Sequence, residues 1–262
     1  MIAAGVIGWP IGHSKSPVIH RFWLAALGIE GEYSRFAVTP ERLGEAIRAL
    51  PALGLRGVNV TVPHKVAVMD FLHAVEPGAA RIGAVNSVIC EADGRLVGFN
   101  TDAPGFWAPL RGRDFSHAVV IGAGGAARAV VAALVDSGVQ KVTVVNRSRA
   151  AAEALAEEVL SYAPGMQLPA ADLVVNASSM GMVGQAPLEV GLGELPPEAV
   201  VYDLVYAPLE TGLLRGARGM GMMTIDGLEM LVGQAAVAFE RFFGVAPPRE
   251  RDAELRTLLV AK

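Results

Sequence analysis

Short apolar runs alternate with segments of helical period along most of the chain, and this alternation constrains the fold more than any other feature. Such alternation is typical of parallel sheets covered by helices, because each pair of parallel strands needs a crossover connection. We therefore predict an α/β fold. The predicted strands are residues 2–8, 31–37, 55–60, 117–121, 141–146, 172–176, 199–204 and 222–225, and the predicted helices are residues 14–27, 39–50, 64–72, 103–110, 124–138, 148–161, 211–219 and 227–243.

Residues 86–100 depart from this pattern. Two apolar runs flank Asp93-Gly94 there, which is a hairpin signal inside an otherwise parallel series. A new series of strands and helices begins at His117 and ends near Gln234, and a last helix is predicted over residues 248–259. We expect two α/β domains with a cleft between them, one formed by residues 1–101 plus 237–262 and the other by residues 102–236.

Composition excludes several classes of partner. The 262-residue chain has a net charge of -4 and no run of basic residues, so neither nucleic acid nor an anionic membrane surface is expected to bind. The most apolar stretch, residues 118–135, is interrupted by glycines and Arg128 and is not a membrane span. The amino-terminal residues are typical of a first strand rather than a signal peptide. A small molecule is the expected partner.

Cysteine usage indicates a reducing compartment. Cys90 is the single cysteine, and the chain has no Cys/His cluster at the spacing of zinc ligands. We expect a cytoplasmic protein without a structural metal.

A glycine-rich turn joins a predicted strand to a predicted helix in the middle of the chain. The strand 118–121 runs into Gly122-Ala123-Gly124-Gly125-Ala126-Ala127, which fits the dinucleotide fingerprint G-x-G-x-x-[G/A]. Gly122 permits the tight turn, Gly124 admits a pyrophosphate close to the backbone, and Ala127 permits close helix packing. The segment predicts a dinucleotide site at a helix N-terminus.

The end of the next strand bears on which dinucleotide binds. An NAD enzyme places a carboxylate there, whereas this chain has Asn146-Arg147-Ser148-Arg149. Two guanidinium groups suit a 2'-phosphate, so NADP is favoured over NAD. The alternative is that Arg147 and Arg149 are only exposed residues at a helix start.

Lys65 is unusual because the chain has four lysines and eighteen arginines. A lysine amine can exchange a proton, whereas an arginine is effectively always protonated. Lys65 ends one of three polar clusters at predicted strand ends, where ligands of open α/β sheets bind. The clusters are Ser14–Pro17, Asn59–Lys65 and Asn100–Asp102. The clusters suit a small polyhydroxylated ligand, although Ser14, Ser16 and Asp102 could also be helix N-caps.

These motifs together resemble those of the shikimate dehydrogenases, nearly from end to end. The resemblance rests on Gly8–Pro17, Asn59–Lys65, Gly83–Ser87, Asn100–Asp102, Gly122–Arg128, Asn146–Arg147, Asn176–Met182, Asp203–Tyr206 and Asp226–Leu231. It implies an N-terminal substrate-binding domain and a Rossmann-like NADP-binding domain. It also implies the NADPH-dependent, reversible reduction of 3-dehydroshikimate to shikimate in aromatic amino acid biosynthesis.

The resemblance assigns roles to individual residues. Lys65 and Asp102 would be the catalytic pair. The substrate would be bound by Ser14, Ser16, Asn59, Thr61, Asn86, Tyr206 and Gln234. The cofactor would be bound by Gly122, Ala123, Gly124, Gly125, Ala126, Asn146, Arg147, Arg149, Ser178, Leu204 and Gly227.

Two other functions stay open at this point. One is a catabolic quinate/shikimate dehydrogenase that uses either cofactor. The other is a non-catalytic metabolite-sensing module of the same fold, since fold alone does not fix function. A homodimer is compatible with the sequence, which does not determine the oligomeric state.

Overall fold

The computed structural model describes residues 1–261, which divide into two compact units. Unit 1 consists of Met1–Thr101 and the segment from Val232 onward, and unit 2 consists of Asp102–Leu231. The second boundary lies at 231/232, whereas the sequence analysis places it at 236/237. It falls inside one continuous helix, α8 (Gly227–Phe243), so no change of composition marks it.

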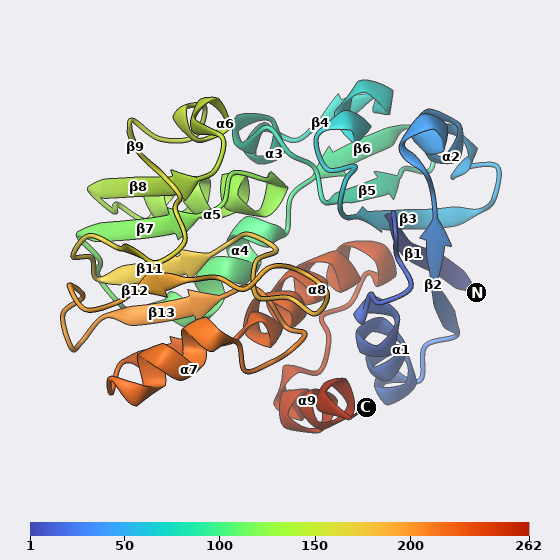
Figure 1. The fold of residues 1–262 in the computed structure, drawn as a ribbon. Helices are drawn as coiled ribbons and strands as arrows, with labels where there is room; N and C mark the ends of the chain where they lie inside the picture. Colours follow the sequence, from blue (N-terminus) through green and yellow to red (C-terminus); the bar gives the residue numbers. More distant parts are fainter. Residues whose placement is uncertain (262) are drawn as a thin grey trace. The chain divides into compact units, whose positions relative to one another are not determined.

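Unit 1 contains a six-stranded mixed sheet (Figure 1). β1 pairs in parallel with both β2 and β3, and β5 pairs antiparallel with β3 and β6. The predicted hairpin is therefore present as β5 and β6. In sheet order the strands are β2 (Gly31–Ala37), β1 (Ile2–Gly8), β3 (Leu55–Val60), β5 (Ser87–Cys90), β6 (Leu96–Phe99) and β4 (Ala74–Val75).

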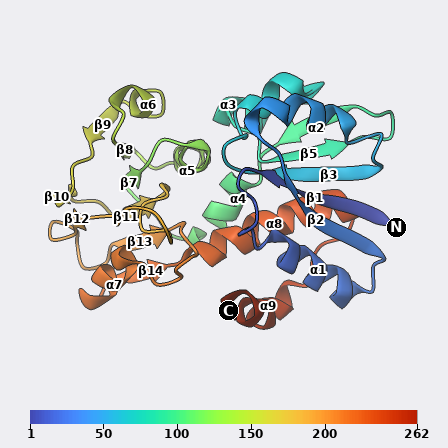
Figure 2. The ribbon, with the colours of Figure 1, turned by 45° about the vertical axis from the view of Figure 1, so that its right-hand side comes forward.

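Helices cover both faces of this sheet. α2 and α3 lie over one face, and α1 and the carboxyl-terminal part of α8 lie over the other (Figure 2). Their bounds are α1 (Ser16–Leu27), α2 (Leu43–Ala49), α3 (Pro77–Ile82) and α9 (Asp252–Val260), with short 3-10 turns at Pro40–Arg42, Ala67–Phe71 and Arg249–Arg251. Ile47 of α2 and Val58 of β3 are buried in the first layer, and Phe242 of α8 lies against Gly57 in the second.

Unit 2 contains a six-stranded sheet in which every pairing is parallel. In sheet order the strands are β14 (Met223–Ile225), β13 (Val200–Asp203), β11 (Leu173–Asn176), β7 (His117–Ile121), β8 (Lys141–Asn146) and β9 (Glu158–Ser161), and a separate pair is formed by β10 (Met166–Gln167) and β12 (Val190–Gly191). This is the doubly wound arrangement that the alternating sequence predicts.

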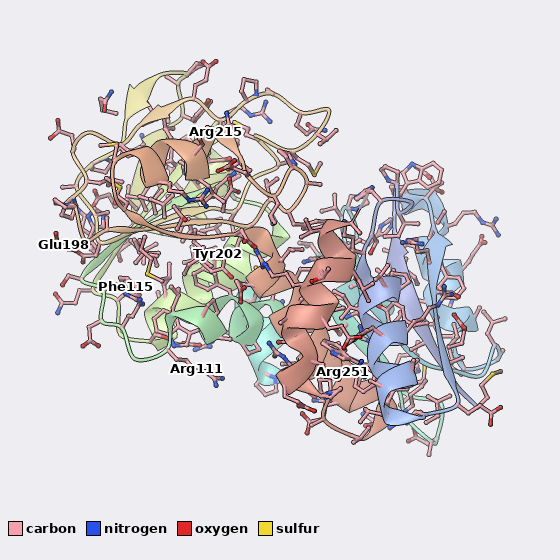
Figure 3. The ribbon with its side chains drawn as sticks, turned by 90° about the horizontal axis from the view of Figure 1, so that it is seen from below. Arg111, Phe115, Glu198, Tyr202, Arg215 and Arg251 are labelled. Carbon is pink, nitrogen blue, oxygen red and sulfur yellow. The ribbon has the colours of Figure 1, made fainter. Side chains whose placement is uncertain are left out.

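Alternate residues of the central strands of unit 2 supply two cores, because successive side chains of a strand point to opposite faces. Val120 packs in a cluster with residues of α4, α5 and α6, whereas Val119 packs with residues of α7. Tyr202 of β13, labelled in Figure 3, is fully buried in the first cluster. The helices are α4 (Asp102–Trp107), followed by a 3-10 turn at Ala108–Leu110, α5 (Gly125–Asp136), α6 (Arg149–Glu153) and α7 (Gly212–Gly219).

The predicted helix over residues 148–161 is wrong in its second half. Helix α6 ends at Glu153, and Glu158–Ser161 forms the edge strand β9, paired in parallel with β8. Val159 is buried there, so sheet pairing and burial outweigh the helical propensity of the alanine-rich segment before it. The helix predicted over 64–72 is likewise only a 3-10 turn at Ala67–Phe71.

Two searches of the described residues bear on the class of protein. No helix in this part of the chain is long and apolar enough to cross a membrane. Over the same residues, no group of three or more His, Cys, Asp and Glu side chains could hold a metal ion.

An aromatic cluster between α1, β2 and α8 surrounds a buried histidine. The ring of His20 stacks on Tyr33 at 3.9 Å between centroids and 7° between planes, and it also contacts Trp23 and Phe239. Neither ring nitrogen of His20 has a hydrogen-bond partner. Burial therefore lowers the pKa of His20 to about 3, so the ring is neutral at neutral pH.

We expect His20 to make the fold acid-sensitive. Below about pH 6.5 the unfolded chain binds a proton at this ring, whereas the folded chain binds it only near pH 3. The free energy of unfolding therefore falls as the pH decreases from about 6.5 toward 3. On going from about pH 7 to about pH 5, the wild type should lose about 2 kcal/mol more unfolding free energy than His20→Phe. Urea titrations at both pH values measure this difference. A matched change at the exposed His13, His13→Gln, should keep the wild-type pH dependence, and equal losses in wild type and His20→Phe would contradict the account.

Candidate active site

The loop after β1 presents two serine hydroxyls in a fixed geometry. Ser14 and Ser16 are both buried, and the Ser14 hydroxyl donates to Ser16 Oγ over 3.3 Å. Arg35 of β2 donates through Nε to the backbone oxygen of Ser14 at 2.9 Å. Lys15 donates to the backbone oxygen of Leu259 in α9. Two cationic side chains thus hold the backbone of this loop from the β2 and α9 sides.

The end of β3 and the loop after it carry Asn59, Thr61 and Lys65. Asn59 is buried at the end of the strand, and the Thr61 amide donates to Ile7 O of β1 at 2.9 Å. The Lys65 carbonyl accepts from the Val85 amide at 2.8 Å. This bond places the backbone of Lys65 beside the residue that precedes Asn86. Lys65 is half-buried, and its neighbour His64 is buried and bonded through Nε2 to Val38 O at 2.7 Å.

Asn86 is bonded through its side chain to Thr101, in the third polar cluster. Its Nδ2 donates to Thr101 Oγ1 at 2.9 Å, and its Oδ1 accepts from the Thr101 amide at 2.8 Å. Thr101 Oγ1 lies 3.4 Å from Gln234 Oε1 of α8. Asp102 follows Thr101 directly and is 4% exposed in the first turn of α4.

Strand pairing brings these clusters to one edge of the unit 1 sheet. β1 and β3 run in parallel with Ile7 opposite Val60, so both strands end at this edge. β5 runs antiparallel to β3 with Ser87 opposite Asn59, so β5 begins there. β6 pairs with Phe99 opposite Ser87 and ends there. The edge therefore gathers hydroxyl, amide and amine groups, which can bind a small ligand rich in oxygen.

The predicted site residues fall in both units. Ser14, Ser16, Asn59, Thr61, Lys65, Asn86 and Gln234 belong to unit 1, and Asp102, Tyr206 and the predicted cofactor residues belong to unit 2. The sequence analysis places Gln234 in the second domain, whereas it lies in unit 1 beside Thr101. Tyr206 is half-buried in the loop after β13.

The glycine-rich turn has the geometry that the fingerprint predicts. Gly122 has a φ of 111°, which L-residues other than glycine rarely adopt, and its amide donates to Val145 O at 2.8 Å. α5 begins at Gly125, and Gly124 at its N-cap is exposed. A Cβ built on Gly124 would meet no atom within 4 Å, so the space beside the helix N-terminus is open. Ala127 is fully buried in the core under the turn.

The other predicted cofactor residues continue from this turn along the carboxyl ends of the strands. A Cβ on Gly122 would lie 3.0 Å from the Ser178 amide nitrogen after β11. Asn176 Oδ1 accepts from the Ser178 hydroxyl at 2.7 Å, and its carbonyl accepts from the Leu204 amide at 3.0 Å. A Cβ on Gly227 would lie 2.4 Å from Leu204 O, so only glycine fits there. Gly122, Ser178, Leu204 and Gly227 thus form one continuous row.

Asp203 holds the loops of this row together. Its carboxyl group accepts from Asn176 Nδ2 at 2.9 Å, from the Val205 amide at 3.0 Å and from Thr211 Oγ1 at 2.7 Å. Burial raises the pKa of Asp203, although these three donors favour its charged form. Asp203 and Thr211 also line a pocket of about 230 Å³ beside Gly181 and Gly212. Asp203 therefore fixes the loops that shape the row.

The end of β8 carries no carboxylate. Asn146 donates to Ser148 O at 3.0 Å, and Ser148 caps α6. Arg147 is exposed, and Arg149 forms an exposed ion pair with Glu153 at 2.7 Å. An exposed ion pair of this kind contributes little to stability, so Arg149 can give up Glu153 and bind a phosphate instead. Open space at the helix N-terminus and two guanidinium groups fit a dinucleotide with a 2'-phosphate.

Sequence reasoning assigned no role to several residues of the site. Arg35, Tyr33, Ser87, Thr101, Asn176 and Asp203 all bond to site residues or fix their loops. Thr101, Asn176 and Asp203 stand inside the motifs, so their position was a signal. Tyr33 and Arg35 lie two residues apart on β2, a strand without a sequence motif, so the sequence gives no signal for a functional role.

We expect Gly124→Ala to weaken dinucleotide binding without weakening the fold. The added methyl meets no protein atom and enters the space open to a pyrophosphate. The dissociation constant for NADP should rise about 10-fold or more, the size of one or two lost hydrogen bonds, while the melting temperature is unchanged. Calorimetric titration measures the first quantity. The control Gly216→Ala, a similarly open position in α7, should bind NADP as tightly as the wild type does. Equal dissociation constants for the two variants would contradict a pyrophosphate site at the glycine-rich turn.

Comparison with known proteins identifies this arrangement. Three family models match: the shikimate dehydrogenase substrate binding domain over residues 6–88, the shikimate/quinate 5-dehydrogenase model over 111–180, and the shikimate 5'-dehydrogenase C-terminal domain over 227–254. Each model is similar to one segment of the chain.

Whole-length relatives agree with the domain models. The NADP+ shikimate dehydrogenase of Rhodospirillum rubrum is 51% identical, over 99% of this chain and 97% of its own length. That of Sphingopyxis alaskensis is 53% identical, over 98% and 97%. The crystal structure of shikimate 5-dehydrogenase from Thermus thermophilus with NADP(H) and shikimate is 39% identical and matches with a TM-score of 0.88, covering 99% of this chain and all of that one. The chain belongs to the shikimate dehydrogenase family.

Proposed function

We propose that this chain is an NADP-dependent shikimate dehydrogenase that interconverts 3-dehydroshikimate and shikimate in the biosynthesis of aromatic amino acids. One observation carries the proposal: three segments that are distant in the sequence bring Ser14 and Ser16, Asn59 and Lys65, and Asn86 to one edge of the unit 1 sheet. The edge combines groups that bind a carboxylate and hydroxyls with an amine that can exchange a proton. Family membership supports the same reaction.

In this proposal unit 1 is the substrate-binding domain. The Ser14 and Ser16 hydroxyls and the amides of Asn59 and Asn86 form hydrogen bonds with the hydroxyls and carboxylate of the substrate, with Thr61 and Gln234 beside them. Tyr206, which belongs to unit 2, is a further proposed substrate ligand. Most of these groups are buried and already hydrogen-bonded to the protein, so little conformational freedom is lost when the substrate binds.

Unit 2 is the NADP-binding domain of the proposal. The turn Gly122–Ala126 and the start of α5 bind the pyrophosphate, and Asn146, Arg147 and Arg149 bind the adenosine end with its 2'-phosphate. Ser178, Leu204 and Gly227 line the path toward the nicotinamide. The bound cofactor supplies the hydride chemistry of the reaction.

Lys65 and Asp102 handle the proton in this proposal. During reduction the Lys65 ammonium donates a proton to the 3-oxygen of the substrate, and during oxidation the neutral amine accepts it. The Asp102 carboxylate accepts hydrogen bonds from the substrate hydroxyls and stabilises the lysine cation. A positioned acid or base of this kind contributes about 10²- to 10⁴-fold to the rate.

We expect Lys65→Ala to lower kcat for shikimate oxidation by about 10²- to 10⁴-fold with a smaller change in KM, because the proton acceptor is lost while the substrate contacts stay. Initial rates of NADPH formation give both constants. Lys141→Ala removes an exposed lysine that pairs with Glu158 and should leave both constants unchanged. A Lys65→Ala enzyme with wild-type kcat would refute the proton-transfer role.

We expect Arg147→Asp to shift cofactor preference. A carboxylate repels the 2'-phosphate of NADPH and can bond the ribose hydroxyl of NADH instead. The ratio of kcat/KM for NADPH to that for NADH should fall by about 10-fold or more. Arg111→Asp, at an exposed arginine of unit 2 labelled in Figure 3, makes the same charge change away from the turn and should leave the ratio as it is. The same result with both variants would argue against a phosphate contact at Arg147.

We also propose that the enzyme acts in the cytoplasm, where its single cysteine stays reduced. Cys90 is buried, and burial raises the pKa of its thiol to about 11, which keeps it protonated and unreactive. A homodimer is the oligomeric state to test, by sedimentation with and without substrate.

A further inference from the structure

A buried tyrosine that the family motifs do not include is bonded to two residues of the substrate site. Tyr33 of β2 is 0% exposed, and its hydroxyl donates to Asn59 Oδ1 at 2.5 Å. The same hydroxyl is hydrogen-bonded to the Ser16 side chain. A group on the neighbouring strand thus joins the loop after β1 to the end of β3.

The donor and acceptor roles in this contact follow from the hydrogen bonds on both sides of the amide. The Tyr33 hydroxyl donates its one proton to Asn59 Oδ1, so the amide presents its oxygen to Tyr33. The Asn59 amide nitrogen then faces the other way, toward Ser87 Oγ at 2.8 Å. Burial raises the pKa of Tyr33 well above its ordinary value, so the proton stays in place over the working pH range. Tyr33 therefore sets the orientation of the Asn59 amide.

The chain of hydrogen bonds continues from Asn59 to the rest of the site. Ser87 donates to Asn86 Oδ1 at 3.2 Å, Asn86 Nδ2 donates to Thr101, and Thr101 lies within hydrogen-bond distance of Gln234. Ser14, Ser16, Asn59, Asn86 and Gln234 are thus connected through three side chains without an assigned role: Tyr33, Ser87 and Thr101. A change at one end can alter the orientation of amides at the other, because each amide has two distinct ends.

The Tyr33 ring is fixed by its surroundings. It stacks on the neutral His20 ring, which also contacts Trp23 and Phe239. A fully buried ring in this cluster does not reach a bound substrate. Any effect of its hydroxyl on the substrate must pass through Ser16 and Asn59.

We propose that Tyr33 is a positioning residue of the substrate site, whose hydroxyl holds the Asn59 amide and the Ser16 hydroxyl in the orientation that binds shikimate. This inference rests on the proposed function. It assigns a role in substrate affinity to a residue outside the set that contacts the substrate.

The test is Tyr33→Phe, which removes one oxygen and keeps the stacked ring. KM for shikimate should rise about 10-fold, the equivalent of one lost hydrogen bond, while KM for NADP stays within about twofold and kcat changes less than KM. Calorimetric titration of shikimate into the enzyme should give the same loss of affinity. A merely structural role would lower the melting temperature without separating the two KM values.

The chain offers a matched control in unit 2. Tyr202 is also fully buried and stacks on Phe106 at 5.3 Å between centroids, but its hydroxyl bonds to no side chain of the described residues. Tyr202→Phe removes the same atom from a core of the same kind. It should leave KM for shikimate unchanged, and a rise equal to that of Tyr33→Phe would overturn the inference.

Two further measurements distinguish the outcomes. In an Asn59→Ala background, Tyr33→Phe should have less than half of its effect on KM, because the amide it orients is absent; full additivity would overturn the inference. If Tyr33→Phe does not fold, Ser87→Ala breaks the same chain one bond farther on and should raise KM for shikimate, and an unchanged KM would overturn it. A wild-type enzyme that fails to oxidise shikimate would refute the proposed function itself. If the wild type is active and Tyr33→Phe has the wild-type KM for shikimate, only the role of Tyr33 is refuted.

Discussion

The antiparallel pairing of β5 with β3 is the constraint on which the proposed substrate site depends. In an all-parallel sheet Asn86 would begin its strand at the edge opposite to the end of β3. Because β5 reverses direction with Ser87 opposite Asn59, its beginning lies beside the ends of β1 and β3. Serine, asparagine and lysine groups from three distant motifs then share one edge. The hairpin that departs from the alternating pattern is therefore what makes the site.

Unit 2 uses the opposite arrangement for a different ligand. All of its strands are parallel, so their carboxyl ends lie on one edge, and the loops there form the row from Gly122 to Gly227. Backbone amides and close glycine contacts dominate this row, which suits a long phosphate-bearing cofactor. Unit 1 instead presents side chains, which suits a small ligand whose hydroxyls must be told apart. The two sheets thus differ in chemistry as well as in topology.

The sequence predicted the motifs well because their signals are local. The turn at Gly122, the cluster ending at Lys65 and the hairpin at Asp93-Gly94 each depend on neighbouring residues. Glu158–Ser161 was predicted as helix because its strand pairing with β8 is a tertiary effect. Tyr33 and Arg35 received no role, because only the pairing of β2 with β1 brings them to Asn59 and Ser14. Roles that arise from contacts across the sheet carry no signature along the chain.

The central claim is that the polar edge of unit 1 selects shikimate and the glycine-rich row of unit 2 selects NADP. Initial rates of the purified wild-type enzyme with each combination of shikimate or quinate and NADP+ or NAD+ test it most directly. The account predicts that kcat/KM for shikimate with NADP+ exceeds every other combination by about 10-fold or more, since NAD+ lacks the 2'-phosphate contact and quinate brings an additional hydroxyl on a saturated ring. Equal rates with quinate and NAD+, or no turnover with shikimate and NADP+, would contradict it.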